Sequence, residues 1–128
     1  MSDIRHFSTE AGPKAIGPYA TAVMAGGFAY LSGMIPVDPA TGKPELGDAA
    51  SEMTRVLSNI GIVLGELGLS FADIVKTTIF LTDMGEFAKA NEVYKQAFSG
   101  NYPARSCVQV AALPADVHVE VEVIANLK

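Results

Sequence analysis

The chain has 128 residues and carries 9 Lys and Arg against 14 Asp and Glu, so its formal net charge is −5. This length predicts a single domain, residues 1–128, whose core is large enough to fold without disulfides or metal staples, and the single cysteine, Cys107, has no intramolecular partner. The acidic balance argues against nucleic-acid binding, while the lack of an apolar run near ~20 residues and of an N-terminal signal core predicts a cytoplasmic protein that does not enter a membrane.

Short strands are predicted in the first third of the chain. Stretches rich in apolar and β-branched residues indicate them at residues 4–7, 20–25 and 28–35. Gly26 and Gly27 separate the last two stretches and suit the positive φ angles of a two-residue hairpin. Residues 36–47 hold three prolines and two glycines and are predicted to form a loop.

A long amphipathic helix is predicted next. Asp48 can cap its N-terminus, Glu52 lies in its first turn, and Gly68 can follow its C-terminus. Apolar side chains recur every three or four residues over about 20 residues, as expected for one buried face. They are Met53, Val56, Leu57, Ile60, Val63, Leu64 and Leu67.

A central strand and a second helix follow. Residues 74–81 are β-branched and nearly apolar on both sides, which is typical of a strand buried in the middle of a sheet. Asp83 and Glu86 resemble the start of a helix that we expect to run to Gly100. Its apolar stripe is formed by Phe87, Asn91, Tyr94 and Phe98. The amide of Asn91 on that stripe needs a polar partner.

Two further strands, residues 105–112 and 117–127, complete the chain and are expected to pair as a hairpin around Pro114. The order of elements predicts an α/β sandwich with one mixed, approximately six-stranded sheet and two helices on one face. Two helices cannot cover both faces of such a sheet. Charged residues make up only 18% of the chain and hydrophobic residues 49%, so we expect the other face to be buried by self-association.

Side-chain alternation in the last two strands predicts a candidate site. If their valine faces lie under the helices, then Arg105, Cys107, Gln109 and Glu120 point to the helix-free face. A cation and a carboxylate buried at an interface would mark a functional cleft, although a purely structural ion pair accounts for the same spacing. Cys107 fits a small core residue better than a nucleophile, and His118 fits a solvated position.

The chain resembles the reactive intermediate deaminase family, RidA, also called YjgF, over nearly its whole length. Six segments match in order: Ala15-Ile-Gly-Pro-Tyr19, Leu31-Ser-Gly-Met-Ile-Pro36, Val75-Lys-Thr-Thr-Ile-Phe80, Asn91-x-x-Tyr94, Pro103-Ala-Arg-Ser-Cys-Val108 and Val119-Glu-Val-Glu-Val-Ile-Ala125. The resemblance implies a chorismate-mutase-like fold assembled as a homotrimeric barrel, with clefts between subunits.

The resemblance also implies an activity. RidA proteins hydrolyse 2-enamine and 2-imine acids, such as 2-aminoacrylate/2-iminopropionate and 2-iminobutyrate, to 2-keto acids and ammonia. These substrates are released by pyridoxal-phosphate-dependent dehydratases, with which no stable complex is required. The family uses no metal and no cofactor of its own. Its site positions match Tyr19, Ser32, Gly33, Asn91, Arg105, Cys107 and Glu120.

The chemistry of these residue types suits the implied reaction. Arg105 can grip a carboxylate with its planar guanidinium, and Glu120 can activate water or carry protons. Cys107 would contribute its backbone and a small side chain, Tyr19 would wall the cleft, and Ser32 with Asn91 would hydrogen-bond within it.

Two features complicate this interpretation. Many relatives carry Gln where this chain has Met34, so an amide is missing near the cleft. In a simple hairpin Glu120 falls opposite Gln109, which leaves Arg105 about 13 Å away along the strand. Either the register differs, or the side chains lean together, or a neighbouring subunit supplies one partner. A trimer that only binds or senses a small 2-keto acid is therefore an alternative. A holdase or ribonuclease role is a third possibility, which the net charge disfavours for RNA.

Overall fold

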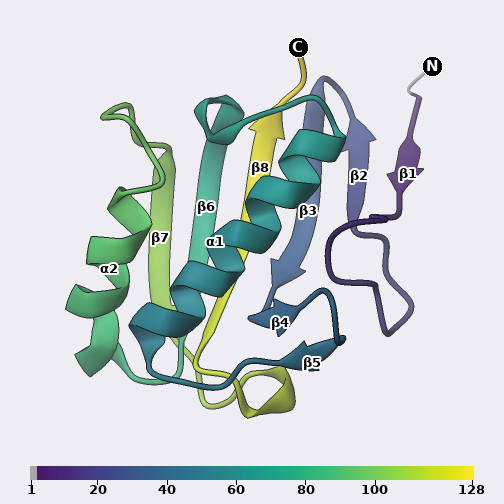
Figure 1. Ribbon diagram of the computed structural model, residues 1–128. Helices are drawn as coiled ribbons and strands as arrows, with labels where there is room; N and C mark the ends of the chain where they lie inside the picture. Colours follow the sequence, from purple (N-terminus) through teal and green to yellow (C-terminus); the bar gives the residue numbers. More distant parts are fainter. Residues whose placement is uncertain (1–2) are drawn as a thin grey trace.

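The computed structural model describes residues 3–128 as one six-stranded mixed sheet with two helices on the same face (Figure 1). The strands are arranged in the order β1-β2-β3-β8-β6-β7. Their bounds are β1 Arg5–Phe7, β2 Ala22–Ala25, β3 Phe28–Met34, β6 Ile74–Leu81, β7 Ala104–Gln109 and β8 Val119–Asn126. The predicted fold class is confirmed.

A small second ribbon lies outside this sheet. Strands β4 (Val37–Asp38) and β5 (Lys43–Pro44) pair with each other inside the segment that was expected to be a plain loop. The predicted hairpin between β2 and β3 is present, with Gly26 at φ 60° and Gly27 at φ 88°.

The long helix, α1 (Ala49–Glu66), begins where its sequence predicts. The Asp48 side chain accepts a hydrogen bond of 2.9 Å from the backbone N–H of Ser51, and Gly68 follows the C-terminus with φ 74°. Its buried face packs against the sheet and forms the core with the alternate residues Val119, Val121 and Val123 of β8.

The second helix is shorter than expected. Helix α2 (Phe87–Lys95) follows a single 3-10 turn, Met84–Glu86, in which the Asp83 side chain accepts from Gly85 N–H. It ends before Phe98, whose ring instead packs from the following turn against Tyr94, with ring centres 5.0 Å apart.

The last two strands do not form the expected hairpin. β7 pairs in parallel with β6, and β6 separates it from β8, which pairs antiparallel to β6. Helix α2 supplies the crossover between β6 and β7 (Figure 1), and parallel neighbours require such a connection. The turn that leads to β8 contains two positive φ angles, at Ala115 and Asp116, and carries the chain past β6.

This topology reverses the face predicted for β7. Arg105 lies beside Thr77, Cys107 beside Ile79 and Gln109 beside Leu81, and these β6 partners are buried under the helices. Arg105, Cys107 and Gln109 therefore point to the helix-covered face, not to the helix-free face. The expectation holds only for Glu120, which alternates with the helix-facing valines of β8.

Candidate active site

Arg105 is held by side chains of α2. Its Nη1 donates a hydrogen bond of 2.6 Å to Asn91 Oδ1, and its guanidinium carbon lies 5.3 Å from the ring centre of Phe87 and 5.2 Å from that of Tyr94. Both distances fall within the ~6 Å range of cation–π contacts. The Tyr94 hydroxyl is fixed in turn by a buried hydrogen bond of 2.7 Å with Thr77 Oγ1.

This arrangement prepares Arg105 to bind an anion. A guanidinium has five N–H donors, and the hydrogen bond of Arg105 to Asn91 occupies a single Nη1 donor. The rings and the amide restrict the rotation of a long side chain, so less conformational entropy is lost when a ligand binds. The planar fork that remains suits a carboxylate. Asn91, expected to need a polar partner, finds it in Arg105.

Cys107 lies on the same side of β7, two residues beyond Arg105. It is half-buried and packs against the hydrophobic core. Burial raises the pKa of its thiol, and the positive charge of Arg105 opposes this shift only in part. Because the thiolate is the reactive form of cysteine, this environment favours an unreactive thiol.

Glu120 occupies a different place, against the bare Cα of Gly33. A Cβ placed on Gly33 would lie 2.1 Å from Glu120 Oε2 and 2.8 Å from Cδ, so only glycine leaves room for this carboxylate. Burial, and secondly the negative charge of Glu122, raise the pKa of Glu120. A raised pKa makes the protonated form of the carboxyl group easier to populate, so the group can donate a proton as well as accept one.

A β-bulge in β3 creates the contact between Gly33 of this strand and Glu120 of β8. The register of β3 against β8 shifts between Leu31 and Met34, which places Ser32 and Gly33 in the bulge. Bulges re-aim side chains and often lie next to active sites. The Ser32 hydroxyl donates a hydrogen bond of 2.7 Å to the Ala20 carbonyl and so ties the bulge to the preceding loop.

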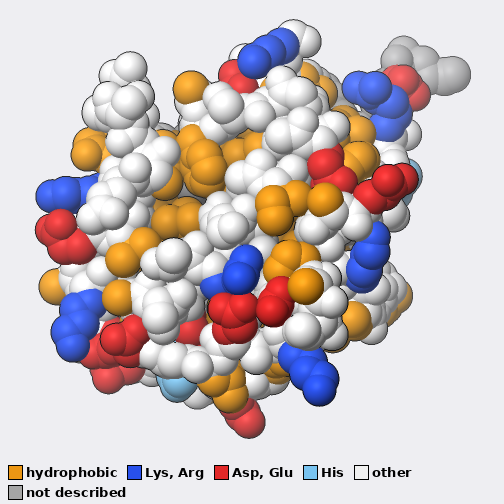
Figure 2. Space-filling view, viewed as in Figure 1, with side chains coloured by type: hydrophobic (Ala, Val, Ile, Leu, Met, Phe, Trp, Pro, Cys, Tyr) orange, Lys and Arg blue, Asp and Glu red, His pale blue; other side chains and the backbone are white. Residues whose placement is uncertain are grey.

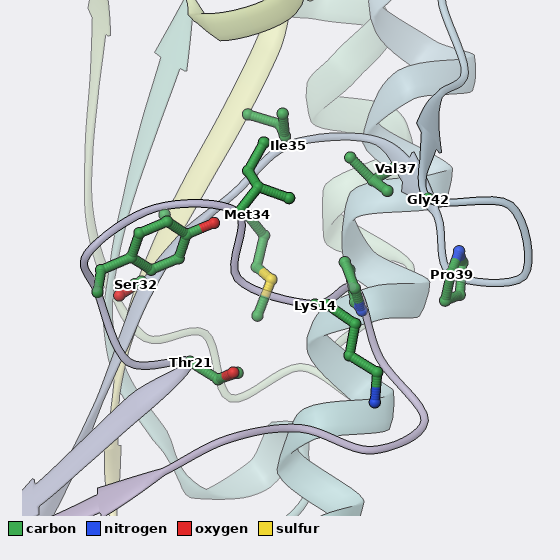
Figure 3. Close-up of a pocket in the computed structure, with 12 residues that line it drawn as sticks. Lys14, Thr21, Ser32, Met34, Ile35, Val37, Pro39 and Gly42 are labelled. Carbon is green, nitrogen blue, oxygen red and sulfur yellow. The ribbon is translucent and has the colours of Figure 1, made fainter.

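A cavity of about 110 Å³ opens beside the bulge. Tyr19, Ser32 and Gly33 contribute to its wall, together with mostly apolar neighbours. Figure 3 shows the Met34 side chain extending into the space between Thr21 and Lys14. The residue that departs from the common Gln therefore faces this cavity, and a thioether leaves its interior without an amide.

The predicted residues thus form two groups, and a single chain does not bring the groups together. Arg105 and Glu120 lie two strands apart, about 10 Å across the sheet, on opposite faces. Glu120 is opposite Phe80, not Gln109, so the register expected from a hairpin is wrong. Gly33, which lies against Glu120, is on β3 and therefore one strand further from Arg105 than Glu120 is.

Comparison with known proteins decides the family. The family model described as "Endoribonuclease L-PSP" matches residues 9–127. A human protein named 2-iminobutanoate/2-iminopropanoate deaminase is 44% identical over 121 residues, which cover 94% of this chain and 88% of the human protein. The crystal structure of a conserved Rid-family protein from Yersinia pestis superposes with a TM-score of 0.94 at 41% identity, covering 98% of this chain and 100% of that one.

The chain belongs to the RidA (YjgF) family. A further solved structure of this kind, Escherichia coli TdcF with bound serine, has a TM-score of 0.90 at 44% identity and covers 97% of this chain and 99% of its own. The TM-scores near 0.9 confirm the Rid-type fold predicted from the sequence.

The surface of this RidA-family protein bears mixed charge. On the face shown in Figure 2, Lys and Arg side chains are scattered among acidic ones. No helix in residues 3–128 has the length and apolarity that a membrane span requires. The same residues contain no group of three or more His, Cys, Asp or Glu arranged to hold a metal ion.

Sequence reasoning missed one residue of this protein that the structure makes prominent. The side chain of Glu52 is fully buried and lies against His118, whose own side chain is 50% exposed, in line with the solvated position expected for it. The available signal was its position: Glu52 stands four residues before Val56, on the apolar stripe of α1. A carboxylate on a buried stripe needs several partners.

Proposed function

We propose that this protein is a deaminase that hydrolyses reactive 2-imino acids, such as 2-iminobutyrate and 2-iminopropionate, to 2-keto acids and ammonia. The observation that carries the proposal is the restrained guanidinium of Arg105, held by Asn91 at 2.6 Å between two aromatic rings. It is supported by relatives named as 2-iminobutanoate/2-iminopropanoate deaminases at about 45% identity.

Arg105 binds the substrate carboxylate and so fixes the position of the neighbouring imine carbon. Orienting a small substrate in this way removes much of the entropic barrier to attack by water. Asn91 and the two rings hold the guanidinium in place before the substrate arrives. Serine bound to TdcF is another small molecule with a carboxylate and a nitrogen on the adjacent carbon.

Glu120 carries the protons. In its neutral form it protonates the enamine carbon or the imine nitrogen, and as a carboxylate it then removes a proton from the attacking water. Water adds to the C=N carbon, the resulting carbinolamine loses ammonia, and the carbonyl of the 2-keto acid remains. The balanced reaction consumes one water and needs no oxidant or reductant.

We infer that the two groups of site residues meet between copies of the chain, in a homotrimer. In a single chain Arg105 and Glu120 face away from each other, and a small imino acid cannot reach both. The helix-free face also exposes large apolar side chains: Phe28 is 36% exposed, Tyr30 45% and Val108 43%. Such a face is suited to burial against neighbouring subunits.

The decisive assay couples a pyridoxal-phosphate threonine dehydratase to this protein and follows 2-ketobutyrate while semicarbazide traps the free imine. Wild type is expected to accelerate keto-acid formation at the expense of the semicarbazone. Arg105→Ala is expected to raise KM sharply, and Glu120→Gln to lower kcat while 2-ketobutyrate still binds. Tight keto-acid binding without any acceleration by wild type would instead indicate a ligand-binding module.

A further inference from the structure

Glu52 is a buried carboxylate with an unusually complete set of partners. Its side chain is 0% exposed. Oε1 accepts hydrogen bonds from the backbone N–H groups of His118 at 2.6 Å and Val119 at 3.2 Å. Oε2 accepts from Gly47 N–H at 3.1 Å and lies 2.6 Å from Nδ1 of the His118 ring.

These contacts connect three parts of the chain. Glu52 belongs to the first turn of α1, where the helix dipole favours a negative charge. Its partners are Gly47 in the loop before α1, His118 immediately before β8, and Val119, the first residue of β8. A carboxylate can accept at both oxygens, whereas an amide offers only one accepting oxygen. The arrangement therefore requires Glu rather than merely tolerating a polar residue.

The anchored residues immediately precede Glu120. Val119 is the first residue of β8. The carbonyl of the preceding residue, His118, accepts a hydrogen bond of 3.1 Å from the backbone N–H of Thr82. The backbone at 118–119 is thus held by α1 through N–H groups and by the end of β6 through a carbonyl. Little freedom remains for the next residue, whose carboxylate lies against Gly33.

We propose that Glu52 is a positioning residue for the deaminase reaction: its hydrogen bonds to the start of β8 set the Glu120 carboxylate in place against Gly33. The inference rests on the proposed function, in which Glu120 transfers protons. Glu52 itself touches no substrate, because it is buried between α1 and the sheet.

The test compares three variants. Glu52→Ala removes all four acceptor contacts, and Glu52→Gln keeps the side-chain size and one accepting oxygen. Leu64→Ala is the matched control, since Leu64 is also fully buried in α1 but lies some three turns from Glu52. Each variant is assayed for kcat and KM at a temperature well below its own melting point.

A displacement of about 1 Å at a catalytic group costs on the order of 100-fold in rate. We expect this loss in kcat for Glu52→Ala, a partial recovery in Glu52→Gln, and little change in KM because Arg105 is not disturbed. Leu64→Ala is expected to lower Tm with kcat nearly intact. A kcat for Glu52→Ala and Glu52→Gln as high as that of Leu64→Ala would overturn the inference.

A second measurement keeps the inference separate from the proposed function. Carbon-13 NMR of the labelled Glu120 carboxyl group follows its titration without any substrate. Glu52→Gln is expected to shift that titration, because the Glu120 carboxyl group leaves its site against Gly33, and Leu64→Ala is expected to leave it unchanged. If wild type does not turn over imines, the proposed function fails, and an unmoved Glu120 titration in Glu52→Gln would still refute the positioning role.

Discussion

The substitution Gly33→Ala tests the place of Glu120 with a single methyl group. The new Cβ would lie 2.1 Å from Glu120 Oε2, so the oxygen must move by about 1.3 Å to recover the 3.4 Å of ordinary contact. Gly33 does not have a positive φ angle, and the atom it meets is the end of a flexible side chain. The backbone therefore tolerates alanine, and stability should change by less than about 1 kcal/mol.

Catalysis should change much more than stability. A displacement of this size at the acid–base group is expected to lower kcat on the order of 100-fold, with KM close to wild type because the substitution leaves the guanidinium of Arg105, which binds the substrate carboxylate, unchanged. The dehydratase-coupled assay gives both constants, and thermal denaturation reports the fold. Gly65→Ala is the control, since an added Cβ there meets nothing within 4 Å.

The reasoning fails if Gly33→Ala turns over substrate as fast as wild type. That result would mean that the contact between Glu120 and Gly33 is not the arrangement in which the reaction occurs. A loss of kcat accompanied by a large fall in Tm would also refute it, because the methyl group would then have disrupted the strands and not only the carboxylate.

Four further measurements test the surroundings of the site. Tyr94→Leu removes a ring that faces the guanidinium and should raise KM by about 5-fold to 10-fold. Tyr94→Phe keeps the ring but leaves the buried Thr77 hydroxyl without its hydrogen-bond partner, and should lower the free energy of unfolding, measured by chemical denaturation, by about 1–2 kcal/mol. The hydrogen bond with Glu52 raises the pKa of His118 above its ordinary 6.5. Stability from this pair is therefore complete below pH 6.5 and declines as pH rises through the higher folded-state pKa. His118→Gln should flatten the dependence of Tm on pH above 6.5. Burial raises the pKa of the Cys107 thiol. Iodoacetamide at pH 7.5 should therefore alkylate Cys107 more slowly than it alkylates the thiol of free glutathione, and a time course followed by mass spectrometry measures both rates.

Local signals in the sequence predicted most elements of the fold. The strand at residues 74–81 coincides with β6, and the cap at Asp48 and the glycine pair at Gly26 work as their chemistry suggests. These features depend on neighbours in the chain, where side-chain type and backbone angle are directly linked.

The pairing of β7 depends on tertiary contacts and was predicted incorrectly. Two consecutive strands with a turn between them suggested a hairpin, yet the helix between β6 and β7 makes these two strands parallel neighbours. Strand, helix and strand in succession favour that arrangement, and applying the rule to residues 74–109 would have placed Arg105 on the correct face. Side-chain alternation along a strand shows which residues share a face. Only the pairing with a neighbouring strand shows whether that face is the helix-covered or the helix-free side of the sheet.

The individual site residues were easier to name than to assemble. Arg105 and Asn91 form one group and Glu120 with Gly33 another, and alternation within single strands carries no information about the distance between such groups. The role of Glu52 was hidden for a similar reason, because an acidic residue in the first turn of a helix is common at the surface.

The division of the site across the sheet has a genetic consequence. If each complete site combines Arg105 of one subunit with Glu120 of its neighbour, two inactive variants can complement each other in a mixed assembly. Arg105→Ala subunits still supply Glu120, and Glu120→Gln subunits still supply Arg105. In a cyclic assembly formed from an equal mixture, about one site in four joins two native halves. Two alleles that each encode an inactive protein would then restore activity when expressed in the same cell.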